Sequence, residues 1–152
     1  LIMCISNNFI GNTFNSNIRR KDTSLMEIGS SPSLMPELSL LENIKYFLFN
    51  DNINEKMITN VLNKYELESF KSDLVRDFSS GMVKRSEIAI ADLKNPKVLC
   101  IDEPKVYLDE NGVDLLLNLI SKREKEGSTS ILSSQESIGA FTSIERSFNL
   151  ND

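Results

Sequence analysis

The chain has 152 residues, of which 40% are hydrophobic and 26% are charged, and its formal net charge is −5. This composition is typical of one globular domain, and the acidic balance argues against a protein that binds nucleic acid through a basic surface. The chain has no His, and Cys4 and Cys100 lie far apart, so we expect no zinc site, His-based triad or disulfide scaffold. No apolar run approaches the roughly 18 residues of a transmembrane helix, so we expect no membrane span.

The N-terminal part of the chain combines irregular sequence with a clear helix start. Residues 1–21 show no periodic pattern, a short apolar piece occupies residues 25–28, and a turn-rich stretch follows at residues 29–36. Ser39 and Glu42 then form a capping box, S-x-x-E, which predicts the start of a helix. The apolar face of this helix comprises Leu41, Ile44 and Leu48.

Three further residues are typical helix caps, because each precedes a segment with helical apolar spacing: Asn54, Ser79 and Asp109. We expect the helix after Ser79 to end at residues 95–96, which are Asn-Pro, and the helix after Asp109 to end at Gly127. The helix after Asn54 has an apolar face made of Met57, Ile58, Val61, Leu62 and Tyr65.

A short apolar segment in the second half, at residues 97–101, is bounded by turn signals and predicts a buried strand. Residues 128–133 are predicted to form a second strand. Because one helix lies between them, the pattern predicts a βαβ unit with two parallel strands and a right-handed crossover.

The strongest candidate for chemistry is the segment V-L-C-I-D-E-P at residues 98–104. Asp102 and Glu103 follow a predicted strand directly, and open parallel sheets bind their ligands at the carboxyl ends of the strands. Asp102 could hold Mg²⁺, and Glu103 could orient or deprotonate an attacking water. The alternative interpretation is a strand followed by an ordinary acidic turn.

A second candidate is the segment F-S-S-G-M at residues 78–82. Ser79, Ser80 and Gly81 would leave backbone N–H groups and two hydroxyls free to contact an anion at a helix N-terminus. The alternative is structural, because Ser79 is also a good N-cap and the two following residues would then only fill the first turn.

The order and spacing of four motifs resemble the second half of an ABC transporter ATP-binding subunit. The motifs are F-S-S-G-M, V-L-C-I-D-E-P, L-D at residues 108–109 and I-L-S-S-Q-E at residues 131–136. In that family they are the signature motif, Walker B, the D-loop and the switch region. The resemblance implies an α/β fold of the P-loop NTPase type, in which a parallel sheet core carries a mainly helical subdomain at about residues 36–94. Residues 1–152 would form a single, partial domain of this kind.

The resemblance also implies roles for individual residues, with ATP and Mg²⁺ as ligands. Asp102 would serve Mg²⁺, Glu103 would act on the attacking water, and Gln135 would occupy the catalytic switch position. The signature residues Ser79, Ser80 and Gly81 would contact the γ-phosphate bound by the opposite subunit. Asp109 would lie at the dimer interface.

A narrower resemblance covers residues 29–43, which read G-x-x-P-x-L-x-P-E-L-S-x-x-E-N. This segment is similar to the ATP-binding subunit of the haem exporter of cytochrome c maturation. It implies membrane-spanning partner subunits and a peripheral position, on the matrix face of the mitochondrial inner membrane or the cytoplasmic face of a bacterial inner membrane.

Several positions depart from the family pattern. No Gly-Lys pair occurs in the chain, so the Walker A loop that cradles phosphates is absent from it. Ser30 and Ser31 stand where the family has Gln, and Gln135 stands where it has His. Ser80 and Met82 replace a Gly and a Gln of the signature motif.

These departures lead us to expect no ATP turnover by the chain alone, but only with a second ATP-binding chain or a separate fragment that bears Walker A. A non-catalytic structural subunit is one alternative, and an unrelated α/β binding domain is another. We also expect the strand before Asp102 to lack its Walker A neighbour, which would leave an open edge that aggregates in water. A partner chain, or a membrane subunit near residues 38–49, would then have to cover it.

Overall fold

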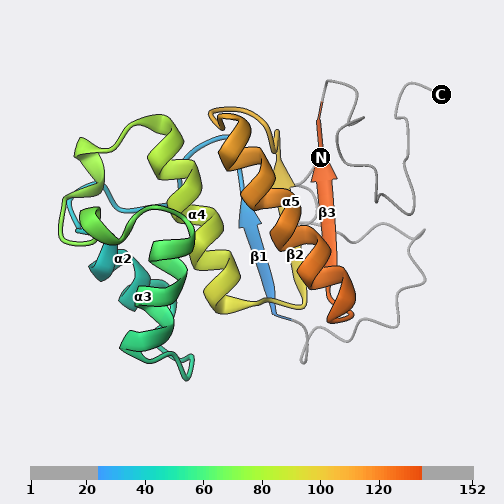
Figure 1. The fold of residues 1–152 in the computed structure, drawn as a ribbon, viewed down its shortest axis with the longest axis horizontal. Coiled ribbons are helices and arrows are strands. Elements are labelled where there is room, and N and C mark those ends of the chain that lie inside the picture. The colour runs from blue at the N-terminus through green and yellow to red at the C-terminus, as the bar shows by residue number, and fades with distance from the viewer. Residues whose placement is uncertain (1–23, 135–152) are drawn as a thin grey trace, which may run out of the picture.

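The computed structural model describes residues 24–134, which contain a three-stranded parallel sheet. The strands are β1 (Leu25–Ile28), β2 (Val98–Asp102) and β3 (Thr129–Ser133). Their order in the sheet is β1-β2-β3, so β2 is the central strand (Figure 1). The register aligns Ile101 with Ile28 on one side and with Leu132 on the other. The predicted parallel pairing of the two strands in the second half is confirmed.

The expectation that the strand before Asp102 has an open edge is wrong. β1 pairs with β2 along residues 25–28, and β3 pairs with its opposite side. Within residues 24–134, the outer edges of the sheet belong to β1 and β3. The expectation failed because it placed a Walker A strand beside β2, whereas β3 occupies that side.

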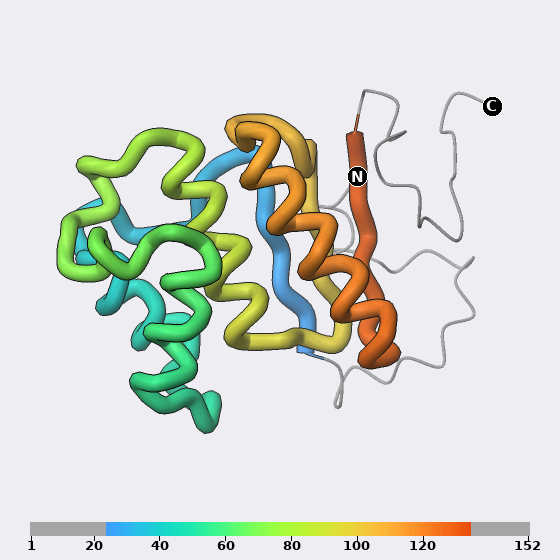
Figure 2. Tube along the Cα trace, viewed as in Figure 1, coloured from blue at the N-terminus to red at the C-terminus, as the bar shows by residue number. Residues whose placement is uncertain are grey.

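The helices form one group beside the sheet and one layer across it. The α-helices are α2 (Leu40–Phe47), α3 (Glu55–Lys64), α4 (Ser80–Lys94) and α5 (Glu110–Lys125), and two short 3₁₀ helices are η1 (Glu68–Phe70) and η2 (Val75–Asp77). Figure 1 shows α2 and α3 to one side, α4 between them and the sheet, and α5 across the sheet. Figure 2 shows that the chain runs from β1 through α2 and α3 and then returns along α4 to β2. This arrangement agrees with the predicted helical insertion, and its boundaries at residues 36 and 94 stay a prediction.

The predicted helix caps are present. Ser39 and Glu42 form a reciprocal capping box, in which the Glu42 carboxylate accepts from the Ser39 N–H at 2.8 Å. The side chains of Asn54, Ser79 and Asp109 each accept a hydrogen bond from a backbone N–H in the first turn of their helices. Each bond satisfies a donor that the helix itself cannot pair.

Two helix ends also follow the prediction. α4 ends at Lys94, and Asn95 adopts a left-handed conformation with φ of 42°. α5 ends at Lys125, and Gly127 has φ of 71°, a region that favours glycine. One predicted core residue is misplaced, because Met57 is 40% exposed on α3.

Alternating side chains of β2 face two different sides of the sheet. Leu99 and Ile101 are fully buried in the main core with residues of the helices, including Leu116 of α5. Val98 and Cys100 are buried on the opposite face, beside Ile131. The prediction that this strand is buried on both faces is therefore confirmed.

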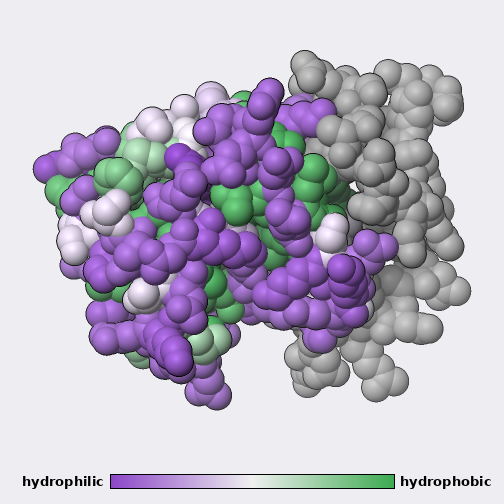
Figure 3. All heavy atoms as spheres, viewed as in Figure 1, coloured by the Kyte–Doolittle hydropathy of each residue, from purple (hydrophilic) through white to green (hydrophobic). Residues whose placement is uncertain are grey.

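The outer surface in the view of Figure 3 is mainly hydrophilic, with hydrophobic residues visible in patches between the polar ones. No helix within residues 24–134 is long and apolar enough to cross a membrane.

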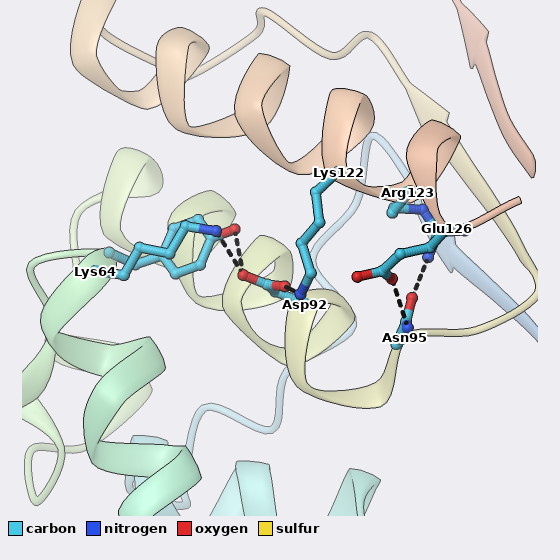
Figure 4. A network of polar contacts seen from close by, with 7 residues as sticks. Lys64, Asp92, Asn95, Lys122, Arg123 and Glu126 are labelled. Carbon is cyan, nitrogen blue, oxygen red and sulfur yellow. Dashed lines mark hydrogen bonds and ion pairs between the residues drawn. The ribbon is translucent and has the colours of Figure 1, made fainter. Parts of the chain in front are cut away.

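A buried carboxylate joins three helices. Asp92 lies on α4 with only 3% of its side chain exposed, and it pairs with Lys64 of α3 at 2.7 Å and with Lys122 of α5 at 2.9 Å (Figure 4). The Tyr65 hydroxyl donates a third bond at 3.2 Å. Burial raises the pKa of Asp92, but the hydrogen bonds from Lys64 and Lys122 outweigh burial, and the pKa lies below its usual value. Asp92 of α4 therefore links α3, in the helical group, to α5, which lies across the sheet.

A second polar cluster fixes the end of α4 to the start of β3. The buried guanidinium of Arg123 donates to the Asn95 side chain at 3.2 Å and to the Thr129 carbonyl at 2.9 Å. The Asn95 amide in turn donates to Glu126 at 3.0 Å (Figure 4).

We predict that Asp92→Asn lowers the free energy of unfolding by about 2–3 kcal/mol at pH 7, because charge-assisted bonds to two lysines are weakened inside the protein. The folded pKa of Asp92 is depressed, so its contribution is present above the unfolded pKa of about 4 and is lost as the pH falls through the folded value. Urea unfolding should be measured from pH 7 to pH 3. The difference in free energy of unfolding between the unmodified chain and Asp92→Asn should shrink below about pH 4. Asp114→Asn, at an exposed position of α5, is the matched control. Equal stability of Asp92→Asn and the unmodified chain at pH 7 would contradict this role.

Candidate functional site

A cavity of about 350 Å³ lies where the carboxyl ends of β1 and β2 meet the N-terminal half of α4. Its polar lining combines residues from these three elements: Ser30, Ser80, Lys84, Glu87, Asp102 and Glu103. The carboxyl ends of parallel strands are the usual place for ligands in open α/β sheets. The position of β2 in the centre of the sheet therefore sets the location of this candidate site.

Both carboxylates of the D-E-P segment are held by serines at the end of β3 and directly after it. The Ser133 hydroxyl donates to Asp102 Oδ1 at 2.5 Å, and the Ser134 hydroxyl donates to Glu103 Oε2 at 3.1 Å. The Glu103 N–H also donates to the Ser133 carbonyl at 2.9 Å. The two acidic side chains therefore have defined partners, which distinguishes this segment from a freely solvated acidic turn.

Glu103 has a strained backbone. Its φ is 47°, in the left-handed region that residues with a side chain seldom adopt, and Tyr107 in the same loop has φ of 67°. Strain of this kind costs roughly 1–3 kcal/mol per residue and concentrates at functional sites. Here it turns the chain sharply at the end of β2 and keeps Glu103 on the lining of the cavity.

The signature residues have separate positions at the start of α4. The Ser79 hydroxyl accepts from the Met82 N–H at 3.2 Å, so Ser79 is the N-cap that the structural alternative predicted. Ser80 lines the cavity together with Asp102. Gly81 lies against the loop after Glu103, since a Cβ built on it would be 3.0 Å from the Tyr107 carbonyl oxygen.

The remaining predicted site residues do not line the cavity. Asp109 is exposed, and its carboxylate caps α5 by accepting from the Gly112 N–H at 2.8 Å. Gln135 lies outside the described residues. The structure thus brings together Ser80, Asp102 and Glu103 from the predicted set, and it leaves Ser79, Gly81 and Asp109 at the edges of the site.

Two charged residues of the site were not predicted. Lys84 and Glu87 lie one turn apart on α4, and they are only 4% and 2% exposed. Burial lowers the pKa of Lys84, and the carboxylates of Glu87, Asp102 and Glu103 partly offset this effect. The available signal was the spacing K-x-x-E within the otherwise apolar line of the helix.

The acidic residues fit part of a magnesium site. Within residues 24–134 there is no group of three or more acidic, Cys or His residues that could hold a metal by itself. Mg²⁺ in nucleotide sites is usually bound by one or two carboxylates together with phosphate oxygens and water. Asp102 and Glu103 match this donor set, provided that a phosphate ligand supplies the rest.

Comparison with known proteins identifies the class. The family model "ABC transporter" matches residues 7–106. The chain is 34% identical over 126 residues to the lantibiotic transport ATP-binding protein SrtF of Streptococcus pyogenes, covering 83% of this chain and 54% of that protein. It is 28% identical over 126 residues to the cytochrome c biogenesis ATP-binding export protein CcmA of Histophilus somni, covering 82% of this chain and 58% of that protein.

A solved structure supports the same assignment. The chain superposes with a TM-score of 0.58 and 27% identity on cbiO1 of Clostridium perfringens, part of the ABC transporter complex cbiONQ, covering 74% of this chain and 47% of that one. The fold is thus the α/β fold of P-loop NTPases, built here on an open parallel sheet. The chain belongs to the ABC transporter family, as a nucleotide-binding domain. It spans about half the length of the curated relatives that it matches.

We predict that Gly81→Ala lowers the free energy of unfolding by about 1–2 kcal/mol, because the new methyl group would press on the Tyr107 carbonyl and push the loop away from α4. Gly29→Ala is the control, since a Cβ there has no neighbour closer than 3.7 Å. Urea unfolding measures the stability, and amide exchange at residues 105–109 reports the displacement of the loop. A Gly81→Ala protein as stable as Gly29→Ala would show that the close approach does not constrain this site.

Proposed function

We propose that this chain supplies the Walker B and signature portion of an ATP-hydrolysing unit in an ABC transporter. The supporting observation is the position of Asp102 and Glu103 in one cavity at the carboxyl end of β2, where serine hydroxyls orient both carboxylates. In this proposal the chain acts with membrane-spanning subunits, and a second ATP-binding chain or a separate fragment contributes the Walker A loop. ATP is the substrate and Mg²⁺ its companion ion.

Each residue has a distinct chemical task in this proposal. Mg²⁺, when bound, neutralises phosphate charge, and Asp102 would hold it while Ser133 fixes the orientation of that carboxylate. Glu103 would orient the attacking water and accept its proton, and Ser134 holds one of its oxygens in place. Both tasks require carboxylates that do not rotate freely, which the two serines provide.

The start of α4 would contact the γ-phosphate bound by the opposite subunit. Helix N-termini present free N–H groups and a positive dipole end to anions. Ser79 accepts one bond as the cap, and its own hydroxyl hydrogen stays available to donate to a phosphate oxygen. Ser80 and Gly81 follow in the first turn, and Asp109 would lie at the contact between the two subunits. Gln135 would occupy the switch position near the same phosphate.

For the transported substrate we propose haem, in the exporter of cytochrome c maturation. The support is the segment at residues 29–43 together with the similarity to CcmA. SrtF, named for lantibiotic transport, is more similar to this chain, at 34% identity against 28% for CcmA, so the choice rests on that segment. The chain would then lie peripherally at the matrix face of a mitochondrial inner membrane or the cytoplasmic face of a bacterial one.

A second candidate function is that of a structural subunit without turnover. Ser30 and Ser31 at the family's Gln position, and Gln135 at its His position, favour this alternative, because both substitutions remove groups that act near the γ-phosphate. The two candidate functions predict different ATP turnover for the Glu103→Gln variant: a large fall for the hydrolysing unit and no change for the structural subunit.

In a reconstituted complex that contains this chain and a Walker A-bearing partner, we predict that Glu103→Gln lowers ATP turnover by about 10²–10⁴-fold, because the amide cannot accept a proton from water. Binding of Mg-ATP should persist, since Glu103 acts on the water and not on the phosphates. Steady-state hydrolysis and a fluorescent ATP analogue measure the two properties.

Glu110→Gln is the matched control, because it makes the same chemical change at an exposed position of α5. Unchanged turnover in the Glu103→Gln complex would contradict a catalytic role and support the structural subunit.

A further inference from the structure

Lys84 and Glu87 are buried charges that the proposed chemistry does not use. Both project from one face of α4. Lys84 binds carbonyls just after β1 and at the end of β2, and Glu87 binds Ser33 in the segment after β1. We propose that these two residues, here named the α4 clamp, are positioning residues that fix the start of α4 relative to the carboxylates at the end of β2. This inference deepens the proposed function and rests on it for its effect on turnover.

Lys84 bridges the ends of the two strands. Its ammonium group donates to the Gly29 carbonyl at 3.2 Å and to the Asp102 carbonyl at 3.3 Å. Gly29 is the first residue after β1, and Asp102 is the last residue of β2. Lys84 therefore joins α4 to the ends of β1 and β2, beside the cavity that all three residues line.

Glu87 holds the segment that follows β1. Its Oε1 atom accepts from the Ser33 N–H at 2.7 Å and from the Ser33 hydroxyl at 2.9 Å. Pro32 and Ser30 of the same segment line the cavity. Glu87 therefore sets the position of one wall of the site from a helix that begins at the signature residues.

The cost of burying these charges argues that the contacts matter. A charged side chain removed from water loses several kcal/mol unless its hydrogen bonds are replaced. In the clamp, two carbonyls and two donors from Ser33 make this replacement, and all of them come from outside α4. Packing of α4 alone would not require charged residues at these positions.

The clamp links two parts of the site that act on different phosphates in the proposed function. Ser79, Ser80 and Gly81 at the start of α4 would contact the nucleotide of the opposite subunit, whereas Asp102 and Glu103 act within this chain's own half. Because a misplacement of about 1 Å can lower a rate by up to about 10²-fold, a loosened clamp should reduce kcat more than it changes KM for Mg-ATP.

The first test uses hydrogen exchange in the full chain, without nucleotide. Glu87→Ala removes the acceptor for the Ser33 N–H, so this amide should exchange at least about tenfold faster, while amides in α3 keep their rates. Glu87→Gln retains a side-chain oxygen and should restore most of the protection. Glu55→Ala, at an exposed position of α3, is the control. Unchanged exchange at Ser33 in Glu87→Ala would overturn the clamp.

The second test uses turnover in the reconstituted complex. Glu87→Ala should lower kcat about tenfold with KM for Mg-ATP changed less than about twofold, and Glu87→Gln should recover most of the rate. If Glu87→Ala fails to fold, Ser33→Ala removes only the hydroxyl bond and should give a smaller fall in kcat. Wild-type rates in both Ala variants would overturn the positioning role. An unmodified complex without turnover would instead contradict the proposed function, and hydrogen exchange at Ser33 would still decide whether the clamp exists.

Discussion

The strand β2 is buried between two parallel neighbours, and this burial sets the positions of the covering helices and of the candidate site. Strands buried on both faces need apolar side chains on both sides, and Leu99, Ile101, Val98 and Cys100 provide them. The pairing of β2 with β3 also fixes the carboxyl end of β2, where Asp102 lies opposite Ser133. The position of Asp102 is thus set by apolar burial and by backbone pairing of β2.

Helix α4 connects this strand end to the remainder of the molecule. The signature residues lie at its start. Lys84 binds the ends of β1 and β2, Glu87 binds Ser33 in the segment after β1, and Asp92 pairs with two lysines of other helices. These contacts all lie on buried parts of one helix. One helix thus contacts the cavity, α3 and α5 through buried side chains.

Features encoded by neighbouring residues could be predicted, and features set by distant contacts could not. The capping box at Ser39, the N-cap Asp109 and the apolar strand before Asp102 depend on spacings of a few residues, and all are present. The open edge was expected because a Walker A strand was placed beside β2, on the side where β3 pairs with it. The pairing of residues 25–28 with β2 on the other side spans the helical insertion. The burial of Lys84 and Glu87 was missed because their partners, Gly29, Ser33 and Asp102, lie outside α4.

We propose that residues 1–152 provide the groups that act on water and Mg²⁺, whereas they contain no Walker A loop to hold the phosphates. A Walker A loop contributes a lysine and several N–H donors, each worth about 1.5–3 kcal/mol when charge-assisted, whereas micromolar binding amounts to only about 8 kcal/mol in total. Calorimetric titration of Mg-ATP into the purified chain, alone and with a Walker A-bearing partner, measures this difference. We predict no micromolar binding to the chain alone and micromolar binding in the presence of the partner. Micromolar binding to the chain alone would contradict it.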